Sequence, residues 1–110
     1  MKTNFLITYD VRDNHEQIIA DLLAKGWHSV VPARQVGTQK PVFCYLPETT
    51  WYKSFETAND AGNEFLAISG INNTLRYMVT SFINWEGSTV SPKQHQVEEA
   101  KNMRLLPALN

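Results

Sequence analysis

The strongest constraint on the fold is the order in which strand and helix patterns follow one another along the chain. Residues 4–9 and 41–46 are apolar on both alternating faces, which is typical of strands in the middle of a sheet. Residues 27–31 and 74–85 also have strand patterns. Apolar residues at helical spacing predict helices over residues 13–26 and about 49–70. The predicted order is therefore strand, helix, strand, strand, helix, strand.

That order favours a ferredoxin-like sandwich, an α+β fold with a four-stranded antiparallel sheet and two helices on one face. We predict that one such domain spans residues 1–90, because 110 residues are close to the commonest domain size. Within it, Asp13 caps the first helix and the second helix begins near Thr49 or Thr50. Pro32 favours an edge position for the second strand, because proline lacks a backbone donor. Residues 91–110 form an extra C-terminal helix and tail, which packs on the same domain or on a partner subunit.

Both helices of such a sandwich lie on one side of the sheet, so the other face needs a cover. The chain is 43% hydrophobic and its central strands are apolar on both faces, which disfavours a solvated face. The strand at residues 74–85 lies at a sheet edge in this topology and invites pairing between chains. We therefore predict a homodimer formed through the open sheet face or through this fourth strand. The C-terminal helix is the rival cover.

Composition and charge exclude several classes of protein. Ten Lys and Arg against eleven Asp and Glu give a net charge of -1, which excludes a strongly basic nucleic-acid binder and makes nucleic acid a disfavoured partner. A single cysteine, Cys44, excludes an intramolecular disulfide framework and suits a reducing, cytoplasmic setting. No segment reaches the ~18 consecutive apolar residues of a membrane span, so we expect no membrane partner.

The predicted topology gathers polar residues at one rim of the sheet, where two strands end and the other two begin. Asp10, Asp13, His28, Glu48 and Arg76 fall at this rim, and both crossover helices start there. Carboxylates at such a rim can hold a hydrated Mg²⁺, with Asp10 as the metal ligand and catalytic residue of a nuclease. His28, Glu48 and Arg76 are the candidate binding residues. A helix cap is the favoured explanation of Asp13, and a turn is the favoured explanation of Asp10.

Sequence motifs of other chemistries are missing. The chain contains no H-E-x-x-H or C-x-x-C spacing, no P-loop, no G-x-G-x-x-G and no G-x-S-x-G. We therefore predict no cofactor, apart from magnesium under the nuclease hypothesis. Cys44 lies inside an apolar strand, where a thiol is usually inert packing. Phe43 and Tyr45 alternate as in RNA-binding sheets, but the basic and glycine positions of that motif are missing, which favours a covered core face.

The opening of the chain resembles a known family. Residues 5–11 have the sequence FLITYDV, and the helix that follows ends at residues 23–26, LAKG. A first strand that ends in Tyr-Asp, followed by a polar turn and an amphipathic helix, is similar to the small ferredoxin-like CRISPR-associated adaptation proteins and their VapD-type toxin relatives. The resemblance implies dimerisation through the sheets. For some members it also implies metal-dependent nuclease activity that uses the strand-end aspartate, here Asp10.

Three functional hypotheses follow. The leading one is a small dimeric binding or assembly protein. The second is a metal-dependent endonuclease that hydrolyses RNA or DNA phosphodiesters with Asp10. The third is a small-molecule sensing module that uses the dimer cleft.

Overall fold

The computed structural model describes residues 1–83 and 92–104 and contains, over these residues, three helices and two antiparallel sheets. The protein is therefore a mixed α+β protein, as predicted. Its elements in chain order are β1 (Thr3–Val11), α1 (His15–Ala24), β2 (Val30–Arg34), β3 (Pro41–Tyr45), β4 (Thr50–Phe55), α2 (Ala58–Ser69), β5 (Thr74–Ser81) and α3 (Gln94–Arg104). The predicted strand end at residues 84–85 and the tail at 105–110 lie outside the described residues.

The chain divides into two compact units, and each is described by itself. Unit 1 consists of Met1–His28 and Glu48–Trp85, and unit 2 consists of Ser29–Pro47 and Glu86–Asn110. None of the described helices is long and apolar enough to cross a membrane.

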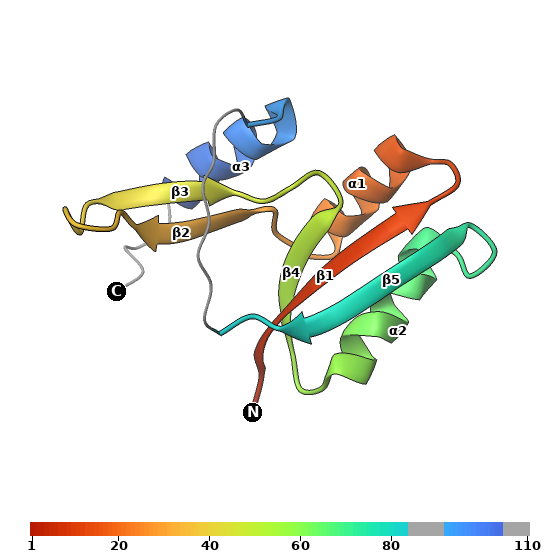
Figure 1. Ribbon diagram of the computed structural model, residues 1–110. Coiled ribbons are helices and arrows are strands. Elements are labelled where there is room, and N and C mark those ends of the chain that lie inside the picture. Colours follow the sequence, from red (N-terminus) through yellow and green to blue (C-terminus); the bar gives the residue numbers. More distant parts are fainter. Residues whose placement is uncertain (84–91, 105–110) are drawn as a thin grey trace. The chain divides into compact units, whose positions relative to one another are not determined.

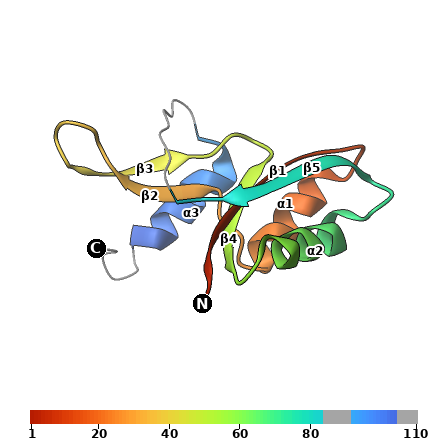
Figure 2. The same cartoon turned by 60° about the horizontal axis from the view of Figure 1, so that its bottom comes forward.

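Unit 1 is a three-stranded antiparallel sheet in the order β4-β1-β5, with α1 and α2 on one face (Figures 1 and 2). Alternate residues of β1 point toward the helices and are buried, which explains why this strand is apolar on that side. On α2, Phe65 is fully buried and packs on Tyr9, with ring centroids 4.7 Å apart. The core of unit 1 is therefore the layer between the sheet and the two helices.

The second half of unit 1 begins differently from the prediction. A helix starting near Thr49 or Thr50 was wrong, because Thr50–Phe55 forms strand β4 and α2 begins only at Ala58. The run from Thr49 to Tyr52 is rich in β-branched and aromatic residues, which fit a half-buried pleated surface better than a helix. Thr57 caps α2, since its Oγ1 accepts a hydrogen bond from the Asp60 amide at 3.1 Å.

The four-stranded sheet of a ferredoxin-like sandwich is not confirmed, because the sheet of unit 1 has three strands. β1 is central, as predicted, but the expectation that residues 41–46 form the other central strand was wrong. That segment contains β3, which pairs only with β2 in a separate two-stranded ribbon. Beyond β4, the sheet of unit 1 carries an isolated bridge in which His28 and Tyr52 exchange two backbone hydrogen bonds of 2.9 Å.

The start of α1 also differs from the prediction. Asn14, rather than Asp13, occupies the N-cap position, with a φ of 65° and no side-chain cap. Asparagine tolerates this left-handed conformation better than most residues. The Asp13 carboxylate instead accepts a hydrogen bond from the Asn14 amide at 2.8 Å, so it stabilises the turn that precedes the helix.

Unit 2 joins the β2–β3 ribbon to α3 by side-chain hydrogen bonds. The ribbon is closed at its base by a hydrogen bond of 2.8 Å from the Leu46 amide to the Ser29 carbonyl. From α3, the buried Gln96 donates to the Ser29 carbonyl at 3.2 Å and to the Leu46 carbonyl at 3.0 Å. Glu99 accepts from both the amide and the hydroxyl of Ser29. Two polar side chains thus fix the helix at the base of the ribbon.

Candidate functional site on the open sheet face

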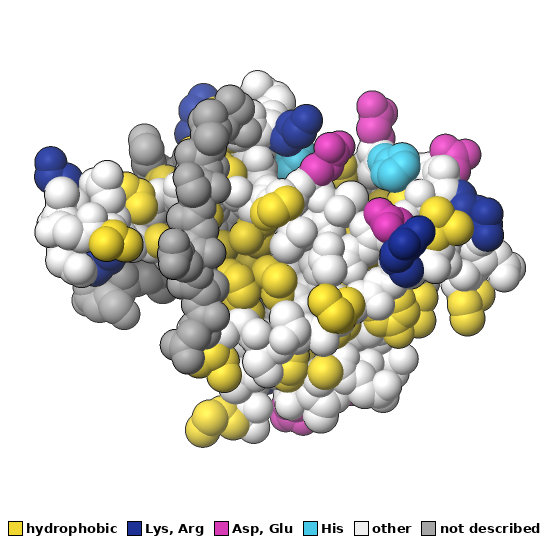
Figure 3. Space-filling model, viewed as in Figure 1, with side chains coloured by type: hydrophobic (Ala, Val, Ile, Leu, Met, Phe, Trp, Pro, Cys, Tyr) yellow, Lys and Arg dark blue, Asp and Glu magenta, His cyan; other side chains and the backbone are white. Residues whose placement is uncertain are grey.

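The candidate site is the face of the unit 1 sheet that lies opposite α1 and α2, which we call the open face. Because paired residues share a face, the register of the three strands defines its members. They include Leu6, Thr8, Asp10, Thr50, Tyr52, Arg76, Met78 and Thr80. Figure 3 views this face and shows hydrophobic side chains on it, with charged side chains toward its upper end. The open face therefore combines an apolar, threonine-rich area with one charged pair.

Asp10 and Arg76 form that charged pair. They lie directly opposite each other on β1 and β5, and Arg76 Nε is 3.0 Å from Asp10 Oδ2. The two side chains are 77% exposed for Arg76 and 53% for Asp10, so solvent screens their attraction strongly. The pair neutralises this end of the open face and leaves it accessible to a ligand or a partner.

A shallow hollow of about 310 Å³ surrounds the charged pair. Its lining includes Thr8, Asp10, Thr49, Arg76 and Met78. Hydroxyl groups, one carboxylate, one guanidinium and an apolar side chain thus meet in one place. These groups can bind a small polar molecule that offers both a donor and an acceptor.

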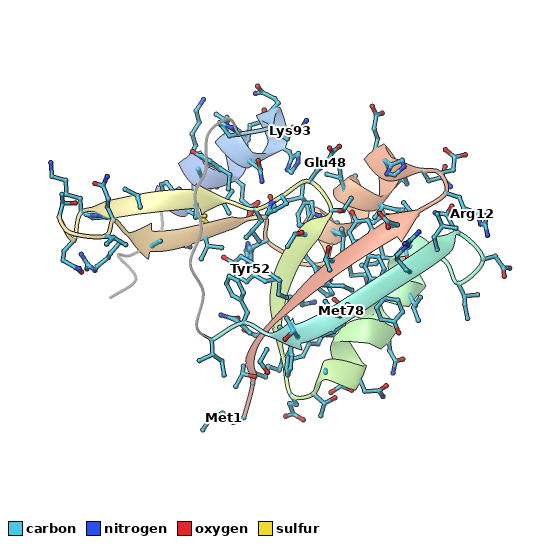
Figure 4. The ribbon with its side chains drawn as sticks, in the orientation of Figure 1. Met1, Arg12, Glu48, Tyr52, Met78 and Lys93 are labelled. Carbon is cyan, nitrogen blue, oxygen red and sulfur yellow. The ribbon has the colours of Figure 1, made fainter. Side chains whose placement is uncertain are left out.

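The other end of the open face is aromatic. Tyr52 stacks on Phe82, with ring centroids 5.4 Å apart and planes at 18°, and the centroid of the His28 ring also lies 5.4 Å from that of Tyr52. Figure 4 labels Tyr52 on β4 and Met78 on β5, with β1 between the two strands. Tyr52 is only 8% exposed, so this cluster is largely covered. The alternation through residues 74–85 predicted a strand that includes Phe82. Its stacking partner Tyr52 could not be predicted, because it lay in the segment at about 49–70 that was predicted as a helix.

His28 does not join Asp10, although both were predicted at one rim. The bridge sets His28 opposite Tyr52, which in turn pairs with Leu6 on β1. Leu6 is four residues from Asp10 along β1, a separation of roughly 13 Å. His28 therefore belongs to the aromatic end of the open face and Arg76 to the charged end.

Glu48 and Asp13 are placed by their interactions with Tyr9 and Asn73. Burial raises the pKa of Tyr9 to about 12, a hydrogen bond with the Trp51 side chain opposes that rise, and the charge of Glu48 adds to it. Asp13 lies in the turn before α1, where its backbone bonds to the Asn73 side chain. Over the described residues, no three His, Cys, Asp or Glu side chains come together as a metal-binding group.

Cys44 is a half-buried free thiol on β3. Burial raises the pKa of its thiol, so the side chain stays protonated at neutral pH and is a poor nucleophile. Its environment agrees with the packing role predicted from the sequence.

Comparison with known proteins finds no matching family model, no similar curated protein and no similar solved structure.

Proposed function

We propose that the protein is a binding or assembly module that forms a homodimer through the sheet of unit 1. The observation that carries this proposal is the exposure of β5, including its Met78 side chain on the open face. Met78 is 63% exposed on that face, and neither α1 nor α2 lies on this side of the sheet (Figure 2). Large apolar side chains left in water favour association, because each contact removes apolar surface from solvent.

We also propose that unit 1 is a ferredoxin-like sandwich with a reduced second strand. Its support is the arrangement of β4, α2 and β5, which places β4 and β5 on either side of β1. The bridge at His28 occupies the outer side of β4, where the second strand of such a sandwich belongs. In this proposal the β2–β3 ribbon is an insertion between that bridge and β4.

Sedimentation velocity over a wide range of concentrations tests the dimer. We expect a species of about 25 kDa, twice the chain mass of 12.6 kDa, that dissociates on dilution. A sedimenting species of 12.6 kDa at every concentration would sink the proposal.

The hollow around Asp10 and Arg76 supports a second function, the binding of a small polar molecule. Thermal shift measurements with a panel of amino acids, carboxylates and amines test it. We expect a ligand to raise the melting temperature of the wild type but not that of Arg76→Gln. Equal shifts in both proteins would place binding elsewhere.

The nuclease hypothesis makes a different demand on Asp10. To bind Mg²⁺, its carboxylate must either ligate the cation through Oδ1 or give up the Arg76 guanidinium, since Asp10 Oδ2 lies 3.0 Å from Arg76 Nε. Incubation with RNA and DNA in the presence of Mg²⁺ or Mn²⁺ tests this. Cleavage that Asp10→Asn abolishes would favour the enzyme over the binding module.

A further inference from the structure

The outer edge of β5 carries backbone groups that no described strand pairs with. Phe82 donates its amide hydrogen to the Asn4 carbonyl, so the even-numbered residues of β5 point their N–H and C=O groups toward β1. The odd-numbered residues Tyr77, Val79 and Ser81 therefore point theirs outward. Leu75 falls at the bulge in the ladder, where the register shifts between Asp10 and Val11.

This edge lacks the features that prevent strands from pairing between chains. β5 spans eight residues and contains neither proline nor lysine, and Arg76, its one charged residue, is paired with Asp10. The opposite edge of the sheet differs, because the bridge at His28 already occupies part of β4. The outer edge of β5 is therefore the place where the sheet is open to extension.

We propose that two copies of the chain pair antiparallel through β5, with Met78 opposite the partner's Met78. This inference rests on the proposed dimer and names the strand and register that form it. Outward-pointing residues must face each other in an antiparallel pair, so only registers that match odd with odd numbers are allowed. The register centred on Met78 forms its innermost hydrogen bonds between Tyr77 and the partner's Val79, twice by symmetry. Both residues lie outside the bulge at Leu75.

The side chains agree with this register. Tyr77 is 41% exposed and lies on the helix side of the sheet, where the register places it against the partner's Val79. An aromatic residue opposite a β-branched one is a favourable cross-strand pair. On the open face, the exposed Met78 side chains of the two copies meet at the two-fold axis. Association through β5 thus covers apolar surface on both faces of the sheet.

Disulfide trapping in the full chain, with Cys44 replaced by alanine, tests the register. At a non-hydrogen-bonded antiparallel pair the Cα atoms are about 4.5 Å apart, within the range that a disulfide spans. We expect Met78→Cys to form an intermolecular disulfide in most molecules under mild oxidation. Thr80→Cys is the matched control on the same strand and face. Its two copies lie four residues apart along the paired strands, roughly 13 Å, which is too far for a disulfide.

A charge variant tests the same contact without oxidation. Met78→Lys sets like charges opposite each other at the axis, and we expect the dissociation constant to rise roughly tenfold or more. Ile71→Lys, an equal change at an exposed residue between α2 and β5, should leave it unchanged. Circular dichroism establishes that each variant is folded.

The outcomes separate the two proposals. A wild type that stays monomeric overturns the dimer itself. A dimeric wild type whose Met78→Lys variant dimerises equally well, or whose Thr80→Cys variant cross-links as readily as Met78→Cys, overturns the register and leaves the dimer standing. Dimerisation lost only in Met78→Lys, with cross-linking only in Met78→Cys, supports both.

Discussion

Asn73 and Asp13 hydrogen-bond to each other in both directions across sixty residues of chain. The Asp13 amide donates to Asn73 Oδ1 at 3.0 Å, and Asn73 Nδ2 donates back to the Asp13 carbonyl at 2.9 Å. The same amide group also reaches the carbonyl of Ser69 at the end of α2. One side chain therefore joins the turn before α1 to the turn before β5, beside the charged end of the open face.

We expect Asn73→Ala to destabilise unit 1 by about 2 kcal/mol, because it leaves several backbone groups without partners. Urea denaturation measures the loss. The neighbouring Asn72→Ala, at an exposed position, is the control and should change the stability by less than about 0.5 kcal/mol. Equal effects of the two substitutions would show that the reciprocal bonds contribute little.

Glu64 offers a second test, at the far side of unit 1. Its Oε2 accepts from Trp27 Nε1 at 2.8 Å and from Lys53 Nζ at 2.7 Å. We expect Glu64→Ala to cost about 2 kcal/mol, since the indole N–H of the buried Trp27 loses its acceptor. Glu64→Gln keeps an acceptor oxygen and should cost about half as much. Tryptophan fluorescence during denaturation follows both, with the exposed Glu56→Ala as control. If Glu64→Ala were no worse than Glu56→Ala, this contact would not stabilise the core.

In unit 2, Gln96 supplies two donors and one acceptor. Beyond its bonds to the ribbon, its Oε1 accepts from the Lys93 amide at 2.9 Å at the start of α3. We expect Gln96→Glu to be more harmful than Gln96→Ala, because a carboxylate would face two carbonyl oxygens with no proton to donate. Amide hydrogen exchange in β2 and β3 measures the opening of this unit separately from unit 1. The exposed Gln94→Ala is the control and should leave that exchange unchanged. If amides of β2 and β3 exchanged faster in Gln94→Ala than in Gln96→Ala, this role of Gln96 would be refuted.

Stability should fall at alkaline pH through Tyr9. Its folded pKa of about 12 exceeds the ordinary value of 10.0, so the folded state holds the hydroxyl proton more tightly. The contribution is complete below pH 10 and is lost between pH 10 and 12, by roughly 2 kcal/mol. Tyr9→Phe should remove this part of the pH dependence while retaining the ring contact with Phe65. Parallel stability curves for the two proteins over this range would contradict the shift.

Much of the fold could be predicted from long periodic patterns. The alternation around Ile7, the stripe that includes Ile18 and Leu22, and the strand after Gly70 are all present in the structure. Strand β4 could not be predicted. Trp51 and Phe55 are four residues apart, as on one face of a helix, and the adjacent Trp51 and Tyr52 are both buried, on opposite faces of the sheet, so the segment shows no polar and apolar alternation. A short apolar segment with aromatic residues satisfies both periodicities, and only tertiary packing decides between them.

The candidate site depended on register rather than on local pattern. Asp10 and Arg76 were placed at one rim from the topology, and the structure brings them into contact. The position of His28 depended on which strand neighbours β4. That pairing is long-range, so nothing near His28 in the sequence specifies it.

The hydrogen bond between the Leu46 amide and the Ser29 carbonyl holds the two ends of the segment that contains the β2–β3 ribbon together. A segment with closed ends can change in length without moving the strands that flank it, because longer loops add little closure entropy. The ribbon is therefore free to lengthen, shorten or change its sequence while β1, β4 and β5 keep their register. Natural variation and protein engineering can therefore replace the ribbon as a unit.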